Sequence, residues 1–148
     1  MPKDGAKYQL INIGSGLALG LGTDHHCAES RALGDEPTLN WTFHIDNEGR
    51  WKIKNQNHRY LGLKDTDMRN RWTVINREPM PTGWSVEIVD RKDPDKGVRI
   101  YYGDSTYLLQ HPPETPNEFA HILLCDNSGS LHEELADRSW LLVEITSE

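Results

Sequence analysis

The sequence has 148 residues, 16 of them basic and 23 acidic, and a formal net charge of −7. No stretch approaches the roughly 18 to 20 apolar residues that a membrane-spanning helix needs, and the first ten residues lack the apolar run of a secretory signal. An acidic chain without a long run of Lys or Arg is a poor match for nucleic acid or an anionic membrane surface. We therefore expect a single soluble domain over residues 1–148 in the cytoplasm.

The predicted strands form a pattern that recurs about every 43 residues. The first strand of each copy alternates apolar and polar side chains and covers residues 8–12, 51–55 and 98–102. A second strand begins near residues 19, 61 and 107, and segments 27–33, 72–76 and 121–125 leave room for a third. Each copy closes on a strand that starts with tryptophan, at Trp41, Trp84 and Trp140. Such an internal repeat determines the whole fold.

Helical periodicity is almost absent, and eight prolines interrupt the chain. Short strands separated by turn residues predict an all-β barrel or sandwich. Three units of four strands, at about residues 6–47, 48–92 and 95–148, favour a twelve-strand barrel capped by hairpins, with about nine extra residues of the third unit in a loop within 126–138. Six strand residues should point into the barrel, namely Leu10, Ile53, Ile100, Phe43, Val86 and Val143.

This threefold layout resembles the β-trefoil, and the resemblance covers residues 8–145. In that fold one unit cannot bury its apolar face alone, whereas three close a barrel around a pseudo-threefold axis. The β-trefoil itself decides nothing about function, which belongs to its loops. We interpret the three tryptophans that open the closing strands as core and cap residues.

No catalytic motif is present, so we predict no enzyme, no cofactor and no metal site. The tightest histidine pair, His25 and His26, has one neighbouring carboxylate in Asp24, which is typical of a polar loop tip rather than of a metal centre. Cys27 and Cys125 are expected to be free thiols, because one potential bridge is too few for a disulfide scaffold.

Two kinds of binding protein share the resemblance, and ricin-B-type lectins are one of them. Their pattern has Gln-x-Trp in each repeat and an aspartate that ends the second strand. Here the Gln positions hold Leu39, Thr82 and Arg138, and the positions where we look for the aspartate hold Leu21, Leu63 and Gln110. A sugar site of another design would fit the third repeat, where an aromatic side chain and polar partners occur together as Asp104, Tyr107, His111 and Asn117.

Protease inhibitors are the other kind, and stiff loops on a closed barrel suit them. Met80 stands between two prolines in the loop 77–83, and the loop 65–71 offers Arg69 or Arg71 as a cation to a trypsin-like pocket. The loop 111–117 contains three prolines and is the stiffest.

The overall layout is similar to the small mushroom β-trefoil inhibitors, the mycocypins of cysteine proteases and the cospin-like inhibitors of serine proteases. The segment of residues 5–12, which includes the first predicted strand, resembles the Gly-x-Tyr-x-Ile-x-Asn strand that these proteins share and departs from it by one residue before Tyr8. In the serine-protease group the reactive loop falls on residues 22–26, which adds Asp24, His25 and His26 to the inhibitory-loop candidates.

The sequence thus favours a monomeric or homodimeric protease inhibitor that binds a serine or cysteine protease. The alternative is a lectin that binds a glycan. A structural, actin-bundling module would normally come as tandem copies.

Overall fold

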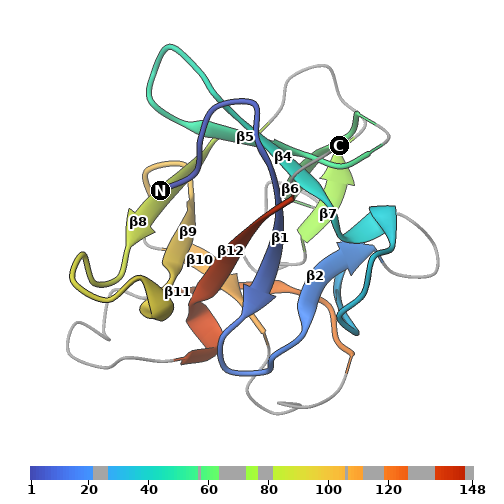
Figure 1. Cartoon of the computed structure of the whole chain (residues 1–148). Helices are drawn as coiled ribbons and strands as arrows, with labels where there is room; N and C mark the ends of the chain where they lie inside the picture. Colours follow the sequence, from blue (N-terminus) through green and yellow to red (C-terminus); the bar gives the residue numbers. More distant parts are fainter. Residues whose placement is uncertain are drawn as a thin grey trace.

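The computed structural model describes residues 1–21, 27–56, 58–63, 73–76, 82–105, 107–111, 119–126 and 136–145. In these ranges the regular structure is almost entirely β (Figure 1). The strands are β1 (Lys7–Asn12), β2 (Ala18–Leu21), β3 (Ala28–Arg31), β4 (Trp41–Ile45), β5 (Trp51–Lys54), β6 (Tyr60–Leu63), β7 (Thr73–Asn76), β8 (Trp84–Ile88), β9 (Val98–Tyr102), β10 (Tyr107–Gln110), β11 (Leu123–Asp126) and β12 (Trp140–Ile145).

Helical structure in the described ranges is limited to three short 3-10 turns, η1 (Pro37–Leu39), η2 (Pro94–Lys96) and η3 (Ala136–Arg138). Proline begins two of them, where its fixed φ suits the first helical position. No helix in the described part of the chain has the length and apolar character needed to cross a membrane.

Six strands close a ring of antiparallel pairs. β1 pairs with β12 and β4, β5 pairs with β4 and β8, and β9 pairs with β8 and β12. The β1–β12 ladder has six residue pairs, from Lys7 opposite Ile145 to Asn12 opposite Trp140. Closure leaves these strands without an unpaired edge, which stabilises a sheet that would otherwise expose backbone donors and acceptors.

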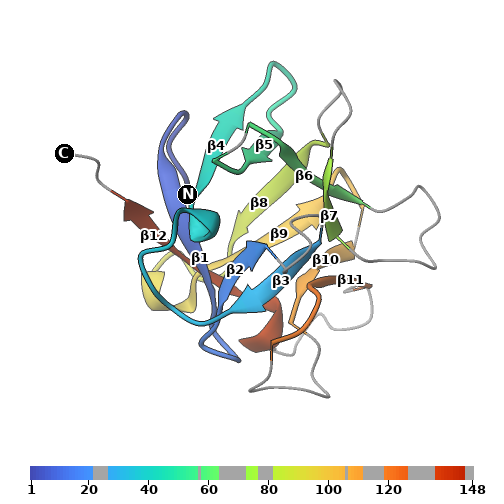
Figure 2. The same ribbon diagram turned by 90° about the vertical axis from the view of Figure 1, so that its right-hand side faces the viewer.

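Three hairpins extend from this barrel, one from each unit. They are β2–β3, β6–β7 and β10–β11, and each is joined through its first strand to β1, β5 or β9 (Figure 2). The third-strand segments expected from the sequence contain β3 and β7, and the third covers β11 except for its last residue, Asp126.

The three repeated tryptophans tie the hairpins to the barrel by the same hydrogen bond. Trp41 Nε1 donates to the carbonyl of Leu19 at 2.9 Å, Trp84 Nε1 to that of Leu61 at 3.1 Å, and Trp140 Nε1 to that of Leu109 at 3.1 Å. All three indoles are fully buried. The predicted core and cap role of these residues is therefore confirmed.

The barrel interior agrees with the predicted alternation except in the last strand. Leu10, Phe43, Ile53 and Ile100 are fully buried, and Val86 packs partly buried against the same cluster. Val143 was predicted to point inward, and this is wrong, because its side chain is 38% exposed. Leu142 packs against the core instead. Alternation counted from the buried Trp140 places residue 142, not 143, on the inner face.

Candidate functional site

All five loop residues predicted to inhibit a protease lie outside the described residues. These are Asp24, His25, His26, Arg69 and Met80. Their role in inhibition therefore stays a prediction. Asn117 of the predicted sugar site also lies outside the described ranges.

The other three members of the predicted sugar site lie along β10 and at its two ends. Asp104 lies in the turn after β9, where its carboxylate pairs with Arg50. Tyr107 opens β10 and packs partly against the core. His111 follows the other end of β10, is 1% exposed, and places Nδ1 2.6 Å from the hydroxyl of Ser30. Four residues of strand separate Tyr107 from His111 by about 13 Å. The structure thus does not gather these side chains around one pocket.

The equivalent positions of the lectin aspartate can be read from the tryptophan hydrogen bonds. The three acceptor residues, Leu19, Leu61 and Leu109, occupy equivalent positions in the repeats. The expected aspartate positions of the first two repeats, Leu21 and Leu63, lie two residues after these acceptors, so the equivalent residue of the third repeat is His111. The sequence comparison had placed Gln110 in this position, one residue too early. Gln110 is instead buried, and its Nε2 donates to Asp137 Oδ2 at 3.0 Å. None of the three equivalent residues is an acid.

Arg50 organises the turn region around Asp104. Its guanidinium also binds the Glu48 carboxylate at 2.9 Å. The backbone N–H groups of Arg50 and Glu48 donate to Asp46 Oδ1 at 3.0 and 2.8 Å, and the Lys52 ammonium lies 3.2 Å from Asp46 Oδ2. The backbone hydrogen bond from Arg50 has the largest effect on the Asp46 carboxyl and lowers its pKa below the usual 3.8. Burial acts in the opposite direction, and the Glu48 N–H and the Lys52 ammonium lower the pKa further. These charges hold a turn in place and are already paired.

A different surface joins the first repeat to the third. We call Glu29, Arg31, Phe119 and His121 the cross-repeat surface. Ser30 N–H donates to the Ala120 carbonyl at 2.8 Å, and Glu29 forms an isolated β-bridge with His121. The chain segment of residues 119–122 therefore runs beside β3.

Three side chains of the cross-repeat surface interact with one another. The Arg31 guanidinium carbon lies 5.1 Å from the centroid of the Phe119 ring, and its Nη1 lies 3.3 Å from Glu29 Oε1. Phe119 is nevertheless 54% exposed, while the side chains of Arg31 and Glu29 are 34% and 20% exposed. An aromatic ring, a carboxylate and a guanidinium thus face solvent together, which combines a stacking surface with acceptors and donors.

Gly20 leaves the space in which the Arg31 stem lies. It pairs with Glu29 across the β2–β3 hairpin, and a Cβ at this position would lie 2.8 Å from Arg31 Cγ and 2.8 Å from Leu39 Cδ2. The absent side chain therefore contributes to the placement of Arg31 over Phe119.

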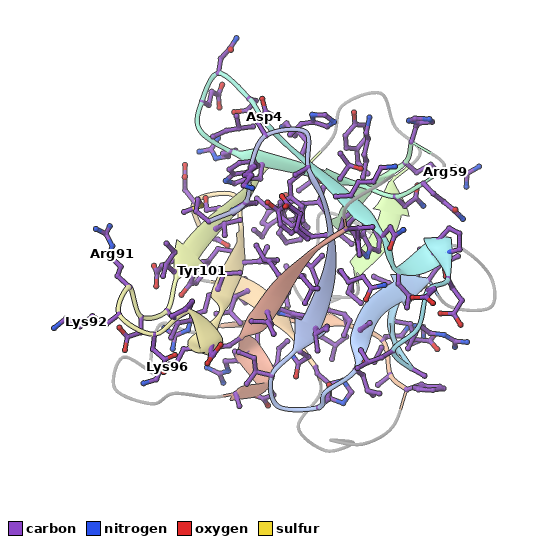
Figure 3. The ribbon with its side chains drawn as sticks, viewed as in Figure 1. Asp4, Arg59, Arg91, Lys92, Lys96 and Tyr101 are labelled. Atoms are coloured by element: carbon purple, nitrogen blue, oxygen red, sulfur yellow. The ribbon has the colours of Figure 1, made fainter. Side chains whose placement is uncertain are left out.

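A cavity of about 290 Å³ lies elsewhere on the barrel, next to the β8–β9 turn. Its lining is mixed: Tyr8, Asp90 and Arg91 contribute polar groups, and the apolar side chains are those of Met1, Ile88, Pro94, Val98, Leu141 and Leu142. Arg91, Lys92 and Lys96 extend from the same turn into solvent (Figure 3).

Comparisons with known proteins give the fold but no relative in sequence. No protein-family model and no curated protein sequence matches the chain. The structure is similar to that of a ricin B-like lectin from Macrolepiota procera in complex with lactose, with a TM-score of 0.78 at 17% identity, covering 97% of this chain and 98% of that one. The chain has the β-trefoil fold.

Two further structures match this β-trefoil over almost the whole of both chains. One is ThreeFoil, a designed 3-fold symmetric protein, with a TM-score of 0.75 at 16% identity and coverage of 94% and 99%. The other is SeviL bound to asialo-GM1 saccharide, with a TM-score of 0.68 at 14% identity, covering 96% of this chain and 99% of SeviL. At these identities the similarity extends to the fold alone.

Sequence reasoning missed the cross-repeat surface of the β-trefoil. Phe119 is one of only two phenylalanines, and it lies in none of the predicted strands. An aromatic residue in a loop of a chain with a thin core is a signal that could have marked it. Its pairing with Arg31, 88 residues earlier, has no counterpart in the sequence pattern.

Proposed function

We propose that the protein binds carbohydrate without catalysing a reaction. The observation that carries this proposal is the cross-repeat surface, where the exposed Phe119 ring stands beside Glu29 and Arg31. Sugar sites combine an aromatic platform for the C–H face of a ring with a few polar groups for its hydroxyls. The fold likeness supports the proposal, because two of the matched proteins were solved with lactose or with a saccharide.

Protease inhibition, the function that the sequence favoured first, is the alternative. Its candidate loops lie outside the described residues, and none of the three matched structures is named as a protease inhibitor. Of the two expected functions, carbohydrate binding is better supported than protease inhibition. The absence of catalysis and the cytoplasmic location stay predictions.

A glycan array with the labelled protein, run beside a panel of serine and cysteine proteases, tests the proposal. We expect binding to a restricted set of glycans and no inhibition of any protease at stoichiometric amounts. Tight inhibition of one protease class together with a blank array would refute carbohydrate binding and support the loop-insertion alternative.

A further inference from the structure

We infer that Glu29, Arg31 and Phe119 form a binding site for a neutral hexose residue, placed between the first and third repeats and present once per chain. This inference rests on the proposed function and specifies its site, its ligand class and its number of copies.

The three side chains are held before any ligand arrives. Arg31 is fixed from one side by the ion pair with Glu29 at 3.3 Å and from another by the Phe119 ring at 5.1 Å. The backbones beneath are tied by the hydrogen bonds from Ser30 to Ala120 and from the Ile122 N–H to the Ala28 carbonyl at 3.1 Å. A site whose parts are already ordered loses little entropy on binding.

The chemistry of these groups matches that of a sugar. Arg31 lies over part of the Phe119 ring, and the ring is still 54% exposed, so its open area can pack against the C–H face of a pyranose. The Glu29 carboxylate accepts hydrogen bonds from hydroxyl groups, and the guanidinium of Arg31 keeps further N–H donors beyond the one directed at Glu29. Hydrogen bonds of this charge-assisted kind are stronger than those between neutral groups.

Charge indicates a neutral sugar rather than an acidic one. Arg31 is the cation of the site, and Glu29 neutralises it at 3.3 Å. A carboxylate or sulfate on the ligand would compete with Glu29 for the same guanidinium and would meet its like charge. The whole chain adds a formal net charge of −7.

The other repeats do not carry the same residues. The hairpin partners of the equivalent leucines 19, 61 and 109 are Ser30, Ile75 and Leu124. The position of Glu29 is therefore taken by Val74 in the second repeat and Leu123 in the third, and that of Arg31 by Asn76 and Cys125. Neither β7 nor β11 supplies the acid and base pair, so the described residues provide one site of this design.

The test titrates lactose, N-acetylglucosamine, mannose and N-acetylneuraminic acid into the full chain and into its variants by calorimetry and NMR. The informative variants are Phe119→Ala, Arg31→Ala and Glu29→Gln. Leu33→Ala is the matched control, because it removes an exposed apolar side chain, 56% accessible, that is not part of the site. Exposed substitutions such as Phe119→Ala leave stability almost unchanged, and circular dichroism verifies that each variant is folded.

We expect one neutral sugar per chain, at least a tenfold loss of affinity for Phe119→Ala and Arg31→Ala, and no change for Leu33→Ala. The acidic sugar should not bind. If the unmodified protein binds neutral sugars and both variants retain that affinity, or if two or three equal sites appear, the site inferred here is wrong while the proposed function stands. If the unmodified protein binds neither these sugars nor any glycan of the array, the proposed function is refuted, and this site with it.

Discussion

Replacing each repeat tryptophan by phenylalanine tests whether the indole hydrogen bond, and not only the size of the ring, fixes the hairpins to the barrel. Trp41→Phe, Trp84→Phe and Trp140→Phe each remove one donor from a buried leucine carbonyl. Leaving such a group unsatisfied costs about 1–3 kcal/mol. The smaller ring forfeits about 1–2 kcal/mol of buried contact. The free energy of unfolding should therefore fall by roughly 2–5 kcal/mol.

For a chain of this length, 1 kcal/mol lowers Tm by about 2–4 °C, so each variant should melt roughly 4–20 °C below the parent protein. Urea unfolding followed by circular dichroism gives the free energies. Trp51→Phe is the control, since Trp51 is also buried, at 6% exposure, but the structure gives its Nε1 no hydrogen bond to another described residue. Losses no larger than that of Trp51→Phe in all three variants would show that the hydrogen bond contributes nothing.

Three further substitutions probe other contacts. Gly97→Ala should cost roughly 2–4 kcal/mol of unfolding free energy, because φ is +74° and the new Cβ would overlap the Trp140 carbonyl group; a melting temperature equal to that of the parent would contradict this. Ser30→Ala should cost about 1–3 kcal/mol by removing the buried 2.6 Å hydrogen bond to His111, and an unchanged urea midpoint would show that this bond is not stabilising. Asp46→Asn should lower Tm at about pH 6 but not at about pH 2, because a carboxylate with a lowered pKa stabilises the fold above 3.8 and loses that effect as it is protonated on acidification. A difference in Tm that is the same at both pH values would exclude this origin.

The threefold repeat was predictable from the sequence because equivalent positions in the three units are buried and carry the same type of residue. Tryptophan is large enough that the same cap position selects it three times, so its spacing in the sequence marks the start of β4, β8 and β12. Which residues of β12 face the core was harder to predict. Residues 140–143 are all apolar, so no alternation of apolar and polar side chains distinguishes the inner face from the outer one. Val143 was assigned inward for that reason.

The alignment of the third hairpin failed on similar grounds. The Leu-Gly-Leu of the first two repeats corresponds to Leu109-Gln110-His111 in the third, which lacks the glycine that fixes the comparison. Only the hydrogen bond from Trp140 to Leu109 shows that His111, not Gln110, matches Leu21.

The cross-repeat surface could not be predicted by any local rule. Arg31 and Phe119 meet because β3 and the segment before β11 become neighbours when the three repeats close. Sequence periodicity compares equivalent positions, whereas this contact joins positions that are not equivalent. The residues that differ between repeats are those that a search for repeats sets aside.

The pairing of β1 with β12 also has a consequence in time, during synthesis of the chain. The ribosome makes β1 first among the strands, yet its longest ladder awaits the strand that is made last. At about 5–20 residues per second, β1 waits on the order of ten seconds for that partner. During this interval the edge of β1 that will face β12 is unpaired and can pair with other chains, whereas its other partners, β2 and β4, are made early.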